Sequence, residues 1–137
     1  MKINFKSEKP ATHITSCLIV PCVETPKPEN CAKELDAKLN GVVASAYKEK
    51  RFDGKANQTL LLNSLGSIKA TNVLLVGVGK AEDISAEKLR QAAGTAIKAA
   101  EKNRFKKVSF LSSKLQTYGS YFMSFSDCMT YLNVLIL

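Results

Sequence analysis

The residues best placed to do chemistry form the run Gly77-Val78-Gly79-Lys80, between an apolar stretch and an alanine-rich one. A glycine turn between a strand and a helix can cradle a phosphate. However, a dinucleotide fingerprint needs a third glycine where Glu82 stands, and a P-loop needs Ser or Thr where Ala81 stands. Glu82 and Asp83 would also repel an anion at the helix start. These glycines are therefore interpreted as structural, permitting a tight turn from sheet to helix.

Few side chains suit nucleophilic or metal chemistry. Catalysis by Ser or Cys needs a base nearby, and we assign no catalytic role to His13, the only histidine. After Glu87 the only carboxylates are Glu101 and Asp127, whereas a two-metal hydrolase needs several that converge. No Cys-x-x-Cys pair occurs, so a closed zinc site would need scattered ligands. We predict no catalytic, cofactor-binding or metal-binding residue in this chain.

Four cysteines are present: Cys17, Cys22, Cys31 and Cys128. The first two fall within one predicted strand, which would separate them by roughly 16 Å. A disulfide needs Cα atoms about 4.4–6.8 Å apart, so this pair is not expected to bridge. We predict reduced, mostly buried thiols and a cytoplasmic protein.

Positive charge is concentrated in one part of the chain. The net charge is +8, and residues 98–114 contain a single acid, Glu101, among the basic residues Lys98, Lys102, Arg104, Lys106, Lys107 and Lys114. A basic patch can bind nucleic acid by neutralising phosphates. No Arg-Gly repeat, row of stacking aromatics or helix-turn-helix pattern accompanies it. A solvated surface is therefore one interpretation of Lys98–Lys107, and a nucleic-acid patch is the other.

The whole chain has the composition of one globular domain. It has 137 residues, of which 45% are hydrophobic and 23% charged. The N-terminal lysines are not followed by an apolar segment, so we expect no signal peptide. No run reaches the roughly 18 apolar residues of a membrane span, and we expect no membrane partner.

Strands and helices alternate in the elements that must position these residues. Apolar and β-branched runs predict strands at residues 2–5, 14–23, 59–63, 72–78 and 107–111. Apolar residues at helical spacing predict helices at residues 30–39, 42–47 and 86–103. Ser85 is the expected N-cap of the last helix, and Gly94 is expected to let it lie close on the sheet. This order indicates an α/β domain with a mixed, mostly parallel sheet.

Two runs carry a family resemblance, LLVGVGK at residues 74–80 and LRQAAGTA at residues 89–96. Weaker matches are FDGK at residues 52–55 and TLLL at residues 59–62. Together they resemble the N-terminal domain of the leucyl aminopeptidase (cytosol aminopeptidase) family, and the similarity covers most of residues 1–111.

The resemblance implies a three-layer, macro-like α/β domain with helices on both faces of its sheet. It also implies a separate catalytic domain that uses two divalent metals (Zn or Mn) to release N-terminal residues, preferentially leucine, from peptides. The N-terminal domain of this family helps to assemble hexamers, and in some bacterial members it contributes to DNA binding. The catalytic signatures Asn-Thr-Asp-Ala-Glu-Gly-Arg and Gly-Lys-Gly-Ile-Thr-Phe-Asp do not occur here, so no metal ligand or catalytic residue is carried over.

The end of the chain departs from the family. Residues 115–137 contain one charged residue, Asp127, and several aromatics. Apolar side chains at helical spacing predict an amphipathic terminal helix, from Phe122 through Phe125, Met129 and Leu132 to Ile136. We interpret residues 1–114 as the N-terminal domain and residues 115–137 as an atypical apolar tail, the product of a truncated or frame-shifted reading.

The function expected from this sequence is that of a non-catalytic N-terminal aminopeptidase domain that serves oligomer assembly and meets peptides only through the catalytic domain. Two alternatives stay open. One is a freestanding macro-like module that binds a nucleotide such as ADP-ribose. The other is a basic module that binds nucleic acid through Lys98–Lys107.

Overall fold

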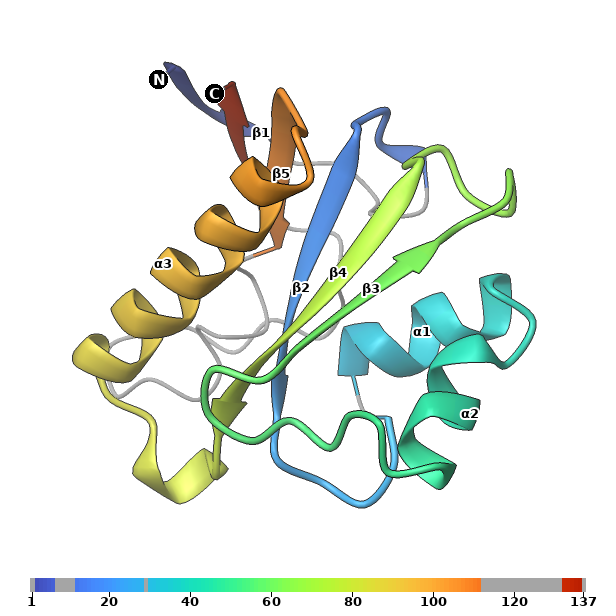
Figure 1. Cartoon of the computed structure of the whole chain (residues 1–137), viewed down its shortest axis with the longest axis vertical. Coiled ribbons are helices and arrows are strands. Elements are labelled where there is room, and N and C mark those ends of the chain that lie inside the picture. The colour runs from blue at the N-terminus through green and yellow to red at the C-terminus, as the bar shows by residue number, and fades with distance from the viewer. Residues whose placement is uncertain (1, 7–11, 29, 112–131, 137) are drawn as a thin grey trace.

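A six-stranded sheet forms the centre of the molecule (Figure 1). The computed structural model describes residues 2–6, 12–28, 30–111 and 132–136. The strand order is β1-β6-β5-β2-β4-β3. The strands are β1 (Lys2–Lys6), β2 (Cys17–Val23), β3 (Thr59–Asn63), β4 (Asn72–Gly79), β5 (Lys107–Leu111) and β6 (Leu132–Ile136).

The sheet is mixed and mostly parallel, as predicted. The neighbours β5, β2 and β4 run parallel, whereas β3 is antiparallel to β4 and β6 is antiparallel to β5. Because β1 is antiparallel to β6, it points the same way as the three central strands. In β2, Pro21 comes after Ile19, the last residue that pairs with β5, so its missing N–H falls where one neighbouring strand has ended.

Helices cover both faces of the sheet, which confirms the three layers. Side chains of β2 alternate between the faces: Leu18 and Val20 pack in one core cluster with α1 (Asn30–Lys38) and α2 (Val42–Lys48). Cys17 and Ile19 pack in the other cluster with α3 (Ala86–Lys102). Figure 1 shows α3 on one side of the strands and the α1–α2 pair on the other. A strand buried on both faces is expected to be apolar throughout, as β2 is and as β4 is after Asn72.

The long helix α3 begins as predicted, but Gly94 does not lie against the sheet. Ser85 Oγ accepts a hydrogen bond from the Lys88 N–H at 3.2 Å, so Ser85 is the N-cap. Ala92, Ala96 and Ala100 are the fully buried side chains of the helix. The packing role predicted for Gly94 is wrong, because Gly94 is exposed and a Cβ there would meet nothing within 4 Å. Gly94 is two residues away from both Ala92 and Ala96, so it lies on the opposite side of the helix from these buried alanines.

Two element predictions need correction. The strand predicted from residue 14 starts at Cys17, and Ile14 is 71% exposed. The terminal helix is wrong over Leu132–Ile136, which forms strand β6 between β1 and β5. Its backbone groups there pair with strands on both sides, which a helix would forgo. The rest of that predicted helix, Asp127 and Cys128 lie outside the described residues.

The thiols of Cys17 and Cys22 are free and buried, as predicted. Within the described ranges, no helix combines the length and the apolar character needed to cross a membrane.

Candidate functional site

A pocket of about 690 Å³ lies at the carboxyl ends of β2 and β4. After β2 the chain turns to α1 on one face of the sheet, and after β4 it turns through the 3-10 helix η2 (Ala81–Asp83) to α3 on the other. The pocket therefore lies where the two parallel strands part, the place at which open α/β sheets usually bind ligands. Its walls come from the β2–α1 loop, α2, residues 50–55 and the start of η2.

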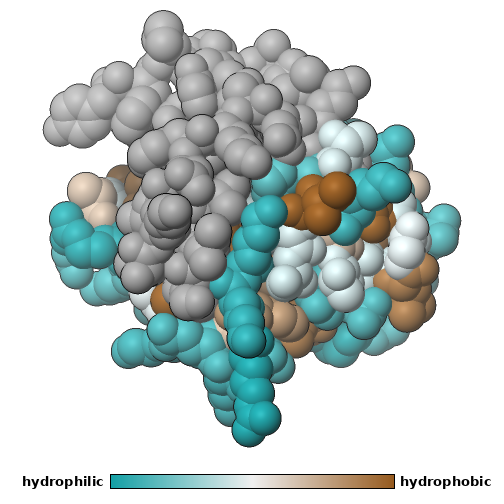
Figure 2. All heavy atoms as spheres, turned by 90° about the horizontal axis from the view of Figure 1, so that it is seen from above, coloured by the Kyte–Doolittle hydropathy of each residue, from teal (hydrophilic) through white to brown (hydrophobic). Residues whose placement is uncertain are grey.

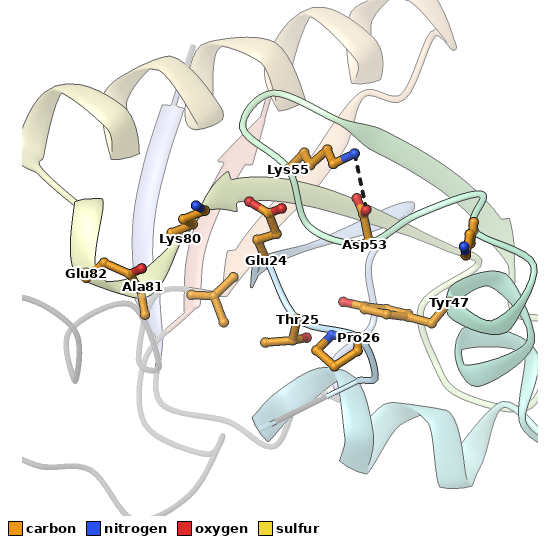
Figure 3. Close-up of a pocket in the computed structure, with 11 residues that line it drawn as sticks. Glu24, Thr25, Pro26, Tyr47, Asp53, Lys55, Lys80, Ala81 and Glu82 are labelled. Atoms are coloured by element: carbon orange, nitrogen blue, oxygen red, sulfur yellow. Dashed lines mark ion pairs between the residues drawn. The ribbon is translucent and has the colours of Figure 1, made fainter.

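The charges that line this pocket are mixed. Three carboxylates (Glu24, Asp53, Glu82) and three ammonium groups (Lys50, Lys55, Lys80) contribute to the wall. Lys55 Nζ lies 3.6 Å from Asp53 Oδ2, the ion pair dashed in Figure 3. Asp53 Oδ1 is buried and has no hydrogen-bond partner among the described residues. A wall of this kind offers no net field that would concentrate an anion such as a nucleotide.

Residues 53–55 form a cup of backbone N–H groups that is already filled. The N–H groups of Asp53, Gly54 and Lys55 donate to Gln58 Oε1 at 3.0, 3.1 and 3.2 Å. Consecutive N–H groups aimed at one point are a common anion-binding device. Here the carboxamide of Gln58 takes the place of the anion. Nucleotide or ADP-ribose binding stays a prediction.

The glycines singled out from the sequence are structural, though Gly77 serves a different purpose from the one expected. Gly77 lies inside β4, where a Cβ would overlap the carbonyl oxygen of Lys55 and the backbone of Gly54. Gly54, at φ +89°, is held as closely against the carbonyl of Val23. Gly79, with φ +87°, needs the left-handed backbone of a turn, as Gly54 does. Lys55, whose carbonyl lies against Gly77, also lines the pocket.

Buried hydroxyl and thiol groups lie beside the pocket. Burial raises the pKa of Cys22 to about 12, although its hydrogen bond with Tyr47 opposes this. Burial, followed by the nearby Cys22, also raises the pKa of Tyr47. The ring of Tyr47 packs edge-on against Phe52, with centroids 5.6 Å apart. Both groups are therefore protonated at neutral pH, and neither is an activated nucleophile.

His13 lies at the opposite end of β2 from the pocket, in a buried polar cluster. His13 Nε2 is 2.7 Å from Ser109 Oγ, and Ser109 Oγ donates to Thr15 Oγ1 at 3.1 Å. Thr15 Oγ1 also approaches the carbonyl of Lys107 at 3.2 Å. His13 and Ser109 are buried, so the cluster joins the start of β2 to β5 instead of facing a substrate.

The predicted basic patch gathers where α3 ends and β5 begins. Lys98 and Lys102 are exposed on α3, and Arg104 and Lys106 are exposed in the connection that follows. Lys107 is half-buried, and its Nζ donates to the carbonyl of Ile14 at 3.1 Å. Nucleic-acid binding by these residues stays a prediction.

Sequence comparison identifies the family. The family model described as "Cytosol aminopeptidase family, N-terminal domain" matches residues 19–122. The chain belongs to this family. The resemblance predicted from residues 52–100 is thus confirmed.

Individual relatives support the assignment. A probable cytosol aminopeptidase of Geobacter sp. (strain M21) is 40% identical over 104 residues, which are 76% of this chain and 21% of the relative. A second, from Geotalea uraniireducens (strain Rf4), is 36% identical over 92 residues, or 67% of this chain and 19% of the relative. The chain therefore spans about a fifth of the length of these relatives.

Solved structures share the fold. A mutant of tomato leucine aminopeptidase matches with a TM-score of 0.62 and 22% identity, over 75% of this chain and 21% of that one. The macrodomain of Mycobacterium tuberculosis DarG matches with a TM-score of 0.62 and 10% identity, over 75% of this chain and 70% of that one. These likenesses confirm the macro-like α/β fold expected from the sequence.

The residues of this domain do not fit the two-metal centre that the family implies. Among the residues that the structure describes, no three His, Cys, Asp or Glu side chains come together as ligands. The acidic side chains around the pocket lie among three lysines, and the positive charge of these lysines would oppose the binding of a divalent cation. No reaction step through a metal is assigned to this chain.

The sequence did not predict the pocket, because its wall comes from four separate segments. One feature of the sequence does indicate the place of the pocket: Glu24 and Lys80 each follow the end of a predicted parallel strand. Residues at that position in open α/β sheets meet at one edge of the sheet.

Proposed function

We propose that this chain acts as the non-catalytic N-terminal domain of a metal-dependent leucyl aminopeptidase, and that its own role is oligomer assembly. One observation carries the proposal: the 40% identical relative covers 76% of this chain, whereas the matched part is 21% of the relative. The peptidase chemistry of such a protein belongs to the remaining four fifths.

The chemistry of the described residues supports this division. Their acidic side chains do not group as metal ligands, and the Cys22 thiol beside the pocket stays protonated, with a pKa of about 12. Peptides would thus be bound and cleaved by the catalytic domain alone, with two divalent metals, zinc or manganese. The names of the relatives, probable cytosol aminopeptidases, support a cytoplasmic location.

Assembly predicts self-association of the domain. Sedimentation equilibrium of the purified 15.0 kDa chain should give an apparent mass that rises to two or more chains as the concentration increases. A range from about 1 to about 200 μM spans the affinities expected for an interface of one small domain. A single species of 15.0 kDa at every concentration would contradict the assembly role.

A further inference from the structure

Among the described residues, no strand pairs with the outer edge of β3. The strand ends the sheet, and β4 is its partner on one side. Gly77 N–H donates to the carbonyl of Gln58 at 2.7 Å, and Ser64 N–H donates to the carbonyl of Thr71 at 3.0 Å. Even-numbered residues therefore direct their backbone groups toward β4. By the alternation of an antiparallel pair, the N–H and C=O groups of the odd-numbered residues, Thr59, Leu61 and Asn63, face outward.

In the part of the chain that the structure describes, this edge lacks the features that usually protect a strand edge. Residues 56–68 (ANQTLLLNSLGSI) contain no charged residue, in a chain that is 23% charged. They contain no proline, and the register between β3 and β4 is unbroken from Thr59 to Asn63. Natural edge strands are generally guarded by lysines, prolines, bulges or a covering element. In Figure 1 the described helices lie over the faces of the sheet and leave the outer side of β3 open.

Exposed apolar side chains adjoin the same edge. Four large hydrophobic side chains are exposed among the described residues, and three of them, Val42 (42%), Leu61 (38%) and Leu65 (87%), lie on or next to β3. Val42 and Leu65 line a hollow of about 240 Å³ that Leu39 and Leu62 also border. Figure 2, which looks onto the end of the molecule where β2 begins and β3 ends, shows brown hydrophobic areas at the surface between teal ones. An apolar surface beside unpaired backbone groups marks an interaction site.

We propose that the β3 edge binds the β3 edge of a second copy of this chain, antiparallel about a two-fold axis at Leu61. This inference rests on the assembly role proposed above and names the surface that performs it. Leu61 then lies opposite its own copy, and Thr59 lies opposite Asn63 of the other chain. The outward N–H and C=O groups of all three residues are paired, and one sheet continues through both molecules.

Charge favours a second copy as the occupant. Two chains of net charge +8 repel each other over most of their surfaces. The uncharged segment 56–68 lets two identical surfaces meet without placing like charges opposite each other. The strand Thr-Leu-Leu-Leu-Asn is also nearly symmetric about Leu61, which suits an isologous contact.

The test compares three variants by sedimentation equilibrium of the full chain. In Leu61→Pro the ring removes an outward N–H and leaves the bonds to β4 in place, because Leu61 does not bond toward β4. Leu61→Lys places a positive charge on the two-fold axis. Ile14→Lys is the matched control, since Ile14 is 71% exposed and belongs to the segment before β2. Both Leu61 variants should weaken self-association by at least about tenfold, whereas the control should associate like the unchanged chain.

The outcomes separate the two proposals. Far-UV circular dichroism and the urea midpoint first establish that each variant is folded. If the unchanged chain associates and both folded Leu61 variants associate equally well, the β3 contact is wrong and the assembly role stands. If the unchanged chain is a 15.0 kDa monomer throughout, both proposals are overturned.

Disulfide trapping tests the register independently. In the proposed pair the Leu61 Cα atoms are about 5.5 Å apart, within the range that a disulfide spans. Two Thr59 residues are offset by about 14 Å along the strands. Leu61→Cys should therefore form a cross-linked dimer under mild oxidation, above the background of the native cysteines, and Thr59→Cys should not. Equal cross-linking of the two variants would overturn the register.

Discussion

Gly77 and Gly94 are in opposite situations within one β4–α3 unit. A Cβ on Gly77 would overlap the Lys55 carbonyl, whereas a Cβ on Gly94 would meet open space. We expect Gly77→Ala to lower the free energy of unfolding by about 2 kcal/mol or more, because the backbone of residues 54–55 must shift. Urea unfolding, followed by circular dichroism, measures this change.

Gly94→Ala is the matched control for that substitution. An exposed alanine inside a helix should raise the free energy of unfolding by about 0.5–1 kcal/mol, since it restricts the unfolded chain. If Gly77→Ala were as stable as the unchanged protein, the close approach between β4 and residues 54–55 would be contradicted.

The buried thiols make stability depend on pH in the alkaline range. Burial raises the pKa of both Cys17 and Cys22 from 9.0 to about 12. Above pH 9 the unfolded state loses these protons and the folded state keeps them. The free energy of unfolding should therefore hold below pH 9 and fall above it, by about 1.4 kcal/mol per pH unit for each thiol.

Urea unfolding at several pH values between about 8 and 11 checks this slope. Cys22→Ala removes one of the two thiols, so its stability should fall less steeply with pH, whatever its stability at pH 8. Equal slopes in the variant and the unchanged protein would show that Cys22 titrates normally in the folded state.

Among the elements, α3 depends on its N-cap residue, Ser85. Ser85 Oγ accepts the Lys88 N–H at 3.2 Å, and Glu87 lies in the first turn. We expect Ser85→Ala to lower the free energy of unfolding by about 1 kcal/mol, because one helix N–H loses its acceptor. Ser85→Asp keeps an acceptor at the cap and should restore the stability. Urea midpoints that are equal for Ser85→Ala and the unchanged chain would contradict the cap.

Elements with a strong local pattern were predictable from the sequence. The strands Thr59–Asn63 and Lys107–Leu111 have the predicted bounds, and α3 ends one residue early, at Lys102. Apolar residues at strand or helix spacing decide such segments locally. The predicted bounds are wrong where pairing with strands distant in the sequence determines the end of an element. Strand β2 begins at Cys17 because its pairing with both Asn72 of β4 and Val108 of β5 begins there.

Features made by distant segments could not be predicted. Strand β6 (Leu132–Ile136) has apolar residues at a spacing that also suits a helix, and its position between β1 and β5 decides the outcome. The role of Gly77 likewise depends on the approach of residues 54–55, which lie more than twenty positions earlier. The pocket could not be predicted either, because the ends of two strands and two loops together form its wall.

At the scale of the whole molecule, the described residues form an α/β sheet with one core on each face, and the chain spans about a fifth of the length of its relatives. Both clusters of buried residues lie against the same sheet, one under α1 and α2 and the other under α3. The matched segment is 21% of the length of the 40% identical relative. In the proposed function, this domain contributes to assembly and the peptidase chemistry belongs to the rest of the longer protein.

The absence of peptidase activity in this chain is tested by incubating the purified chain with a leucyl anilide and added zinc or manganese. We predict no release of leucine above the rate of the metal alone, because the described acidic side chains do not gather as metal ligands. Turnover that survives repurification and disappears with a chelator would contradict it, and would place a metal-dependent peptidase site within this chain.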